Sequence, residues 1–157
     1  MIQENYKFKS DLWGFRSIRN HKAIKAIVFL YIVILFSACS LISKFDQYAY
    51  VQSTSLKVEA LALLDEGTDN YAEKVTDVKA LEMKLLKAYE YERFRPKNEI
   101  TTAQWKLIVD PEGNLFGGAM RLWAEQKKLS KTYIENKKVQ LSKAFDEIST
   151  LEASKIK

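Results

Sequence analysis

Apolar residues recur at helical spacing through most of the chain after residue 42. Residues 42–65 carry a stripe that repeats every three, four or seven positions, formed by Phe45, Ala49, Leu56 and Leu63 with their neighbours Tyr48, Ala60 and Leu64. A second stripe runs through residues 70–94 and a third through residues 130–153. Because this spacing places apolar side chains on one side of a helix, it predicts three long amphipathic helices.

Glycine and proline divide this part of the chain. After Cys39 they occur at Gly67, Pro96, Pro111, Gly113, Gly117 and Gly118. These residues favour turns and loops, so breaks are expected near residues 65–70, 95–99 and 110–118. Two short helices, residues 101–109 and 115–127, are predicted between the second and third long helices.

Capping patterns predict where two of the long helices begin. Asn70 is followed three residues later by Glu73, which is the spacing of a capping box. Ser130 is expected to cap the last helix, with Leu129 and Ile134 at the positions of a hydrophobic staple.

The first short helix also has an apparent start signal. Thr101 is the expected N-cap, with Gln104 as its partner and Ile100 and Trp105 at staple positions. Gly67 is expected to end the first long helix, and residues 110–113 have the composition of a type I turn in which Gly113 is available for a left-handed conformation.

The predicted fold class is all-α. Short connections favour antiparallel neighbours, so we expect a small antiparallel bundle of three long and two short helices, following an N-terminal signal or anchor helix. The 119 residues from Cys39 onward suffice for one domain with a modest core. No strand-like alternation competes with this prediction.

Residues 26–38 form an uncharged, mostly apolar segment behind a basic arm, and the chain's single cysteine follows it. A secretory signal has a basic n-region, an apolar h-region of about 7–15 residues and small residues before the cleavage site. Residues 1–25, residues 26–36 and the pair Ser37 and Ala38 fit these three roles. The pattern therefore predicts export.

The sequence Ser37-Ala38-Cys39 resembles the lipobox of bacterial lipoproteins, whose usual form is Leu-Ala/Ser-Gly/Ala-Cys. In that family the cysteine is diacylated on sulfur, the signal is cleaved before it, and the new amino terminus is acylated. The resemblance implies cleavage between Ala38 and Cys39, lipidation of Cys39, a signal peptide of residues 1–38 and a lipid-anchored domain of residues 39–157. Phe36 departs from the usual Leu.

Two other interpretations of this segment remain open. In the first, residues 26–42 form an uncleaved anchor helix. Its 17 residues are few compared with the usual length of about 20 for a helix that spans the bilayer. A buried core helix is the third possibility, although a helix that is apolar on every side needs a larger protein around it. The lipoprotein and anchor interpretations both place the domain outside the cytoplasm, on the cell membrane or an outer membrane. Ser40 resembles the residue found in lipoproteins sent to an outer membrane.

Charge argues against nucleic acid as a partner. The chain has 25 basic and 20 acidic residues, but six of the basic and two of the acidic residues precede Cys39. The 19 basic and 18 acidic residues that follow leave the domain nearly neutral, without the basic field that phosphate binding needs. A lysine-rich side of the last helix is expected to be solvated or, alternatively, to touch anionic lipid.

The inventory of side chains after Cys39 excludes several chemistries. His21 is the chain's only histidine and lies in the predicted signal, so histidine-dependent catalysis and ordinary zinc sites are not expected, and we predict no cofactor and no metal. Carboxylates remain, at Glu90, Glu92, Asp110 and Glu112, but no spacing singles out a catalytic pair. No catalytic residue is therefore predicted.

Residues 114–123 concentrate apolar side chains around a glycine pair. Gly117 and Gly118 favour close packing of the backbone on a neighbouring helix over an anion site, because the Walker and Rossmann spacings are missing. The same region supplies the candidate partner surface, formed by Trp105, Leu115, Phe116, Met120 and Trp123. Core packing is the competing interpretation of these residues.

These observations predict a cell-envelope lipoprotein that acts as a protein-binding or structural component near the membrane, held by acyl chains on Cys39. A carboxylate-dependent cell-wall enzyme is one alternative. A lysis or exclusion accessory lipoprotein of a phage or mobile element is another, because such proteins are also short, helical and acylated.

Overall fold

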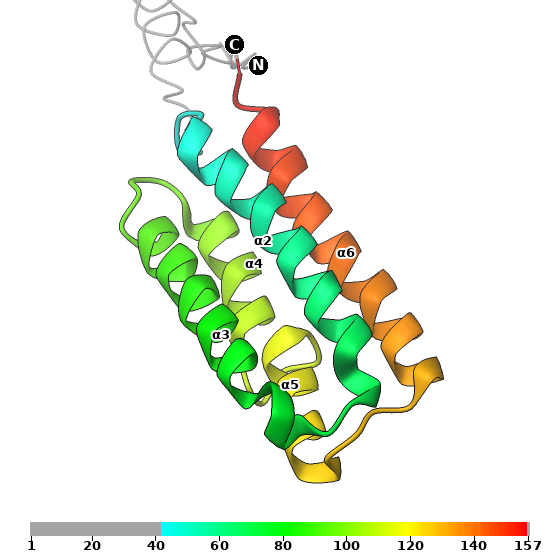
Figure 1. The fold of residues 1–157 in the computed structure, drawn as a ribbon. Coiled ribbons are helices and arrows are strands. Elements are labelled where there is room, and N and C mark those ends of the chain that lie inside the picture. Colours follow the sequence, from blue (N-terminus) through cyan, green and yellow to red (C-terminus); the bar gives the residue numbers. More distant parts are fainter. Residues whose placement is uncertain (1–41, 157) are drawn as a thin grey trace, which may run out of the picture. The chain divides into compact units, whose positions relative to one another are not determined.

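The computed structural model describes residues 42–156, which form a helical bundle without strands (Figure 1). The long helices are α2 (Gln47–Asp65), α3 (Tyr71–Arg93) and α6 (Lys131–Ala153), and a 3-10 turn, η1 (Glu66–Thr68), follows α2. The short helices are α4 (Glu99–Val109) and α5 (Phe116–Gln126). The predicted signal, cleavage and lipidation residues, Ala38 and Cys39 among them, lie outside the described residues.

The predicted fold class is confirmed. Helices α2, α3, α4 and α6 run alternately in opposite directions, with α2 between α3 and α6 and α4 closing the bundle between the same two helices (Figure 1). Helix α5 packs against α3 and α4 near the end where α2 finishes.

Local caps define most helix starts. Asn70 Oδ1 accepts a hydrogen bond from the backbone of Ala72, and Ser130 Oγ accepts one from the backbone of Tyr133, as predicted for both caps. Helix α2 begins at Gln47 instead of near residue 42, because Asp46 caps it by accepting from the Ala49 backbone.

The predicted start of α4 is wrong. The helix begins at Glu99, with Asn98 at the N-cap position, so Thr101 lies inside the first turn and is buried. Ile100 is exposed and Trp105 is fully buried, which is inconsistent with the predicted staple. The Asn98 side chain makes no cap hydrogen bond, because it bonds to Ser43 and Glu92 instead.

Glycine and turn predictions are confirmed in part. The Gly113 backbone donates to the Asp110 carbonyl at 3.0 Å, which closes the expected turn. No described glycine has a positive φ, however, so neither Gly113 nor Gly67 uses a left-handed conformation. A methyl group on Gly67 would lie 3.0 Å from Ile134 and 3.1 Å from Leu129, so the glycine allows these predicted staple residues to pack closely against the end of α2.

The two ends of the bundle are tied by different contacts. At the end where α2 finishes, the Leu129 backbone donates to Gly67 at 2.7 Å and Trp123 Nε1 donates to Asp69 at 3.1 Å. At the other end, residues 42–46, the connection between α3 and α4, and the last turn of α6 converge (Figure 1).

Candidate functional site

Buried charges gather where the three segments converge. We call this group the end cluster, and it consists of Ser43, Asp46, Glu92, Arg95, Asn98, Glu152 and Lys155. Glu92 and Glu152 are each only 1% exposed, and the Arg95 and Lys155 side chains are also largely covered. Buried charges are costly unless they are paired and hydrogen-bonded, so their partners decide what the cluster does.

Arg95 joins the two buried carboxylates. Its Nη1 donates to Glu92 Oε2 at 2.8 Å and its Nη2 donates to Glu152 Oε1 at 2.9 Å. Lys155 Nζ bonds Glu152 Oε2 at 2.5 Å, and Asn98 donates to Glu92. Two buried negative charges therefore meet two buried positive charges.

The cluster also fixes residues 42–46 to the rest of the domain. The Asp46 backbone donates to Glu152 Oε1 at 2.7 Å, and the Ser43 backbone donates to the Lys97 carbonyl at 2.7 Å. The Ser43 hydroxyl donates to Asn98 Oδ1 and accepts from Lys155. The segment that follows the predicted lipidation residue is thus held by side chains from α3, the α3–α4 connection and α6.

The two carboxylates have opposite pKa shifts. Burial raises the pKa of Glu92, and the charge and hydrogen bonds of Arg95 offset this only in part. Burial acts in the same direction on Glu152, but hydrogen bonds from Arg95, Lys155 and the Asp46 backbone outweigh it and lower the pKa. Neither carboxylate is open to a substrate, so the cluster is a structural element.

Asp46 also orders an aromatic pair beside the cluster. Tyr91 donates its hydroxyl to Asp46 Oδ2 at 2.6 Å, which raises the pKa of Tyr91 to about 12. The Tyr91 ring meets the Tyr48 ring edge-on at 5.0 Å between centroids. An exposed aromatic surface therefore borders the end cluster.

The candidate partner surface predicted from the sequence is wrong. Trp105, Phe116, Met120 and Trp123 are at most 1% exposed, and Leu115 packs partly buried against the core. Trp105 packs edge-on against Phe145 at 5.7 Å between ring centroids, inside the bundle. Core packing, the competing interpretation, is correct.

The glycine pair explains why these side chains are buried. A methyl group on Gly117 would lie 2.5 Å from the Val109 carbonyl oxygen, and one on Gly118 would overlap the Gly113 carbonyl oxygen. The close packing predicted for the pair is confirmed, against the end of α4 and the turn that follows it. Helix α5 therefore lies close against the end of α4, and most of its apolar side chains are buried in the core.

The carboxylates that the sequence offered for catalysis are separated. Glu90 pairs with Arg93 at 3.2 Å near the end of α3, and Glu92 belongs to the end cluster. Asp110 and Glu112 lie at the opposite end of α4, where Asp110 accepts from the Glu112 backbone at 2.9 Å. Helix α4 separates the two pairs, so they do not face each other across one cleft.

One carboxylate that the sequence did not single out lines a cavity with Asp110. Glu82 on α3 shares a cavity of about 560 Å³ with Tyr89, Lys106 and Asp110. Partial burial of the carboxyl raises the pKa of Glu82, although much of the side chain is exposed. No sequence spacing links residues 82 and 110, because they meet only through the packing of α3 on the turn after α4.

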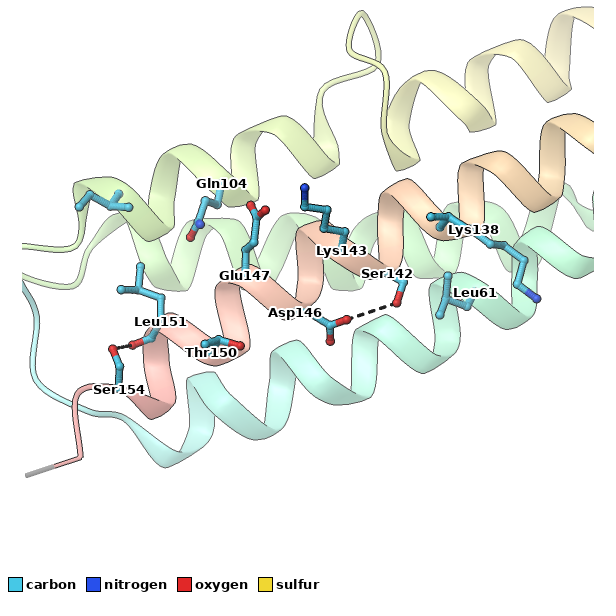
Figure 2. Close-up of a pocket in the computed structure, with 12 residues that line it drawn as sticks. Leu61, Gln104, Lys138, Ser142, Lys143, Asp146, Glu147, Thr150, Leu151 and Ser154 are labelled. Atoms are coloured by element: carbon cyan, nitrogen blue, oxygen red, sulfur yellow. Dashed lines mark hydrogen bonds between the residues drawn. The ribbon is translucent and has the colours of Figure 1, made fainter.

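A larger groove runs along α6, with α2 and α4 on its two sides (Figure 2). Its volume is about 970 Å³, and its apolar lining comes from Leu61, Ile100, Val139 and Leu151. Figure 2 shows Lys143, Glu147 and Leu151 directed toward α4, and Gln104 directed from α4 toward α6. This groove brings together side chains from three helices.

The polar groups of the groove differ in whether they already have partners. Gln104 Oε1 is buried and has no hydrogen-bond partner in the described part of the chain. Asp146 pairs with Lys57 at 2.5 Å and Lys138 pairs with Asp65 at 2.5 Å, so these four charges are already engaged.

The lysine-rich side of α6 is not one uniform surface. Lys137 is buried and donates to the Asn114 carbonyl and to Gln140, and burial lowers its pKa. Lys138 lies in the groove and forms the ion pair with Asp65. The prediction of a lysine surface therefore holds only for the exposed members, which are Lys131 and Lys143 on α6 and Lys127 and Lys128 in the connection before it.

Comparisons with known proteins return no match: no family model fits the chain, and neither the curated proteins nor the solved structures include a similar one. Within residues 42–156, no helix combines the length and apolar character needed to cross a membrane. The same residues contain no group of three or more acidic, histidine or cysteine side chains arranged to hold a metal ion.

Proposed function

We propose that this protein is a cell-envelope lipoprotein whose helical domain binds another protein close to the membrane. In this proposal residues 1–38 direct export, Cys39 carries the acyl chains, and the domain lies outside the cytoplasm on the cell membrane or an outer membrane. The lipobox-like sequence before Cys39 supports the anchor. The groove along α6 supports the binding role.

One observation favours a helix as the bound element. The lining residues extend from Lys138 to Ser154 on α6, which corresponds to roughly 24 Å of helix at about 1.5 Å per residue. Apolar side chains from α2, α4 and α6 line this length, with charged residues among them. An amphipathic helix fills such a groove with its apolar side and leaves its polar side in water.

The exposed valines of α6 and α2 provide a matched test. Val139 lies in the groove and is 72% exposed, whereas Val58 lies on α2 outside the groove lining and is 68% exposed. A photo-crosslinking amino acid placed at each position in cells is expected to give one defined protein adduct from position 139 and none from position 58.

Substitutions at the same two positions test whether binding of the partner depends on the groove. Val139→Glu is expected to abolish binding of the identified partner, and Val58→Glu is expected to leave it unchanged, with both variants folded by circular dichroism. Equal adducts from both positions, or binding that survives Val139→Glu, would contradict the proposed groove.

A second candidate, a carboxylate-dependent cell-wall enzyme, is favoured by the cavity that Glu82 shares with Asp110. Glycoside hydrolysis uses two carboxyl groups, of which the acid has a raised pKa, as Glu82 has. The test is release of soluble fragments from purified cell wall. Loss of this activity in both Glu82→Gln and Asp110→Asn would support the enzyme, and absence of any release by the unmodified protein would exclude it.

A further inference from the structure

Exposed apolar side chains surround the end cluster. Phe94, in the connection after α3, is 75% exposed, and Ile156, after the last turn of α6, is 62% exposed. Tyr48, at the start of α2, is also exposed and contacts Tyr91. These side chains come from segments that converge at this end of the bundle, which makes this end a candidate contact surface.

Basic side chains accompany these apolar groups. Arg93 is exposed, and its guanidinium lies 5.0 Å from the centre of the Phe94 ring. Lys44 and Lys97 are exposed on the segments that meet beside it. The acidic groups on the same segments are Asp46, which accepts from Tyr91, Glu90, which pairs with Arg93, and the exposed Glu99.

The combination of aromatic and basic side chains matches a lipid surface. Aromatic residues collect at the level of the lipid headgroups, where an apolar ring borders a polar environment. Lysine and arginine near an anionic leaflet each contribute about 1 kcal/mol of attraction. A protein surface of the same kind would need a complementary acidic partner, whereas a bilayer containing anionic lipid supplies both properties at once.

The covalent chain limits how far this end can lie from Cys39. Ile42 follows Cys39 by three residues, and three residues of extended chain span at most about 11 Å. The next residue, Ser43, is fixed by its backbone hydrogen bond to Lys97 and by its side chain to Asn98. An acyl chain on Cys39 would therefore hold the connection between α3 and α4 against the bilayer.

We infer that the end of the bundle bearing Phe94 and Ile156 rests on the lipid surface, with the Phe94 ring among the headgroups and Arg93 and Lys44 facing anionic lipid. The inference rests on the proposed attachment at Cys39. The end cluster gives the contact a fixed orientation, because it joins residues 42–46 rigidly to α3 and α6. The long helices then extend away from the membrane, and the groove along α6 stands exposed beside it.

Photo-crosslinking to lipid tests this orientation in the full-length protein as extracted from membranes. The protein is reconstituted in vesicles of phosphatidylcholine and phosphatidylglycerol, with a crosslinking amino acid at position 94 or 156. Positions 58 and 107 serve as matched controls, because Val58 and Leu107 are 68% and 61% exposed and lie away from this end. All four side chains are exposed, so replacing any one of them is expected to leave the core intact. Circular dichroism checks that each variant is folded.

The expected result is a lipid adduct at positions 94 and 156 and no lipid adduct at positions 58 and 107. The intact mass of the same sample shows whether Cys39 is acylated. Acylated protein with no lipid adduct at position 94, or with equal adducts at all four positions, would overturn the orientation and leave the proposed anchor standing. Adducts at position 94 that contain another protein in place of lipid would also overturn it. Protein that is neither acylated nor bound to vesicles would overturn the proposed function and the orientation together.

Discussion

Two buried carboxylates, Glu92 and Glu152, share Arg95 yet differ in the sign of their pKa shifts. The lowered pKa of Glu152 means that its stabilising effect is present above the unfolded-state value, near 4.5, and is lost as the pH falls through the lowered folded value. The raised pKa of Glu92 has the opposite effect: its contribution is present below about 4.5 and is lost as the pH rises through the raised folded value.

Glutamine substitutions separate these two effects at the residue scale. Glu152→Gln removes a charge that Arg95 and Lys155 both need, so we expect it to lower the free energy of unfolding by about 3 kcal/mol at neutral pH. Glu92→Gln retains an acceptor for Arg95 and avoids burying a charge, so we expect a loss of about 1 kcal/mol or less.

Urea unfolding at neutral pH and near pH 4 measures both substitutions. The difference between Glu152→Gln and the unmodified protein should shrink as the pH falls below about 4.5, because the unfolded chain then takes up a proton at Glu152 that the folded protein does not. This lowers the free energy of unfolding of the unmodified protein and not that of Glu152→Gln. A larger loss from Glu92→Gln than from Glu152→Gln, or a Glu152→Gln effect that does not change with pH, would contradict the assignment of the two shifts.

At the element scale, the sequence predicted what depends on local contacts. Asn70 and Ser130 were identifiable as caps because a cap bonds backbone groups two or three residues away. The start of α4 was not, because Asn98 and Thr101 are committed to contacts with the end cluster and the core, which no local pattern records. The apolar stripes similarly predicted that α5 has an apolar surface but not which neighbour covers it.

The close packing of α5 on the turn after α4 predicts that two glycine substitutions differ in their effect on stability. Gly118→Ala places a methyl group against the Gly113 carbonyl oxygen, where rigid backbone must move, so we expect a loss of about 3 kcal/mol in the free energy of unfolding. Gly67→Ala meets only the ends of the Ile134 and Leu129 side chains, which can adjust, so we expect a loss of about 1 kcal/mol. Equal losses in thermal or urea unfolding would be inconsistent with the close approach of α5 to the turn after α4.

For the whole molecule, the two ends of the bundle and its side have separate roles. One end carries the end cluster and receives the chain from Cys39, the other end is closed by the contacts of Gly67 and Trp123, and the groove along α6 lies between them. The sequence predicted the helices and the lipobox-like segment, whereas the groove and the cluster arise from residues 40 to more than 100 positions apart. Such distant pairings depend on tertiary packing, which residue spacing along one chain does not specify.

The attachment of this bundle to a membrane through Cys39 is the central claim, and the intact mass of the protein extracted from membranes tests it most directly. Unmodified protein and Cys39→Ala are compared. We predict a species that begins at Cys39 and carries added acyl mass, and we predict that this species is missing from Cys39→Ala. An unmodified mass that still includes residues 1–38 would contradict the lipid anchor and favour retention of residues 26–42 as an anchor helix.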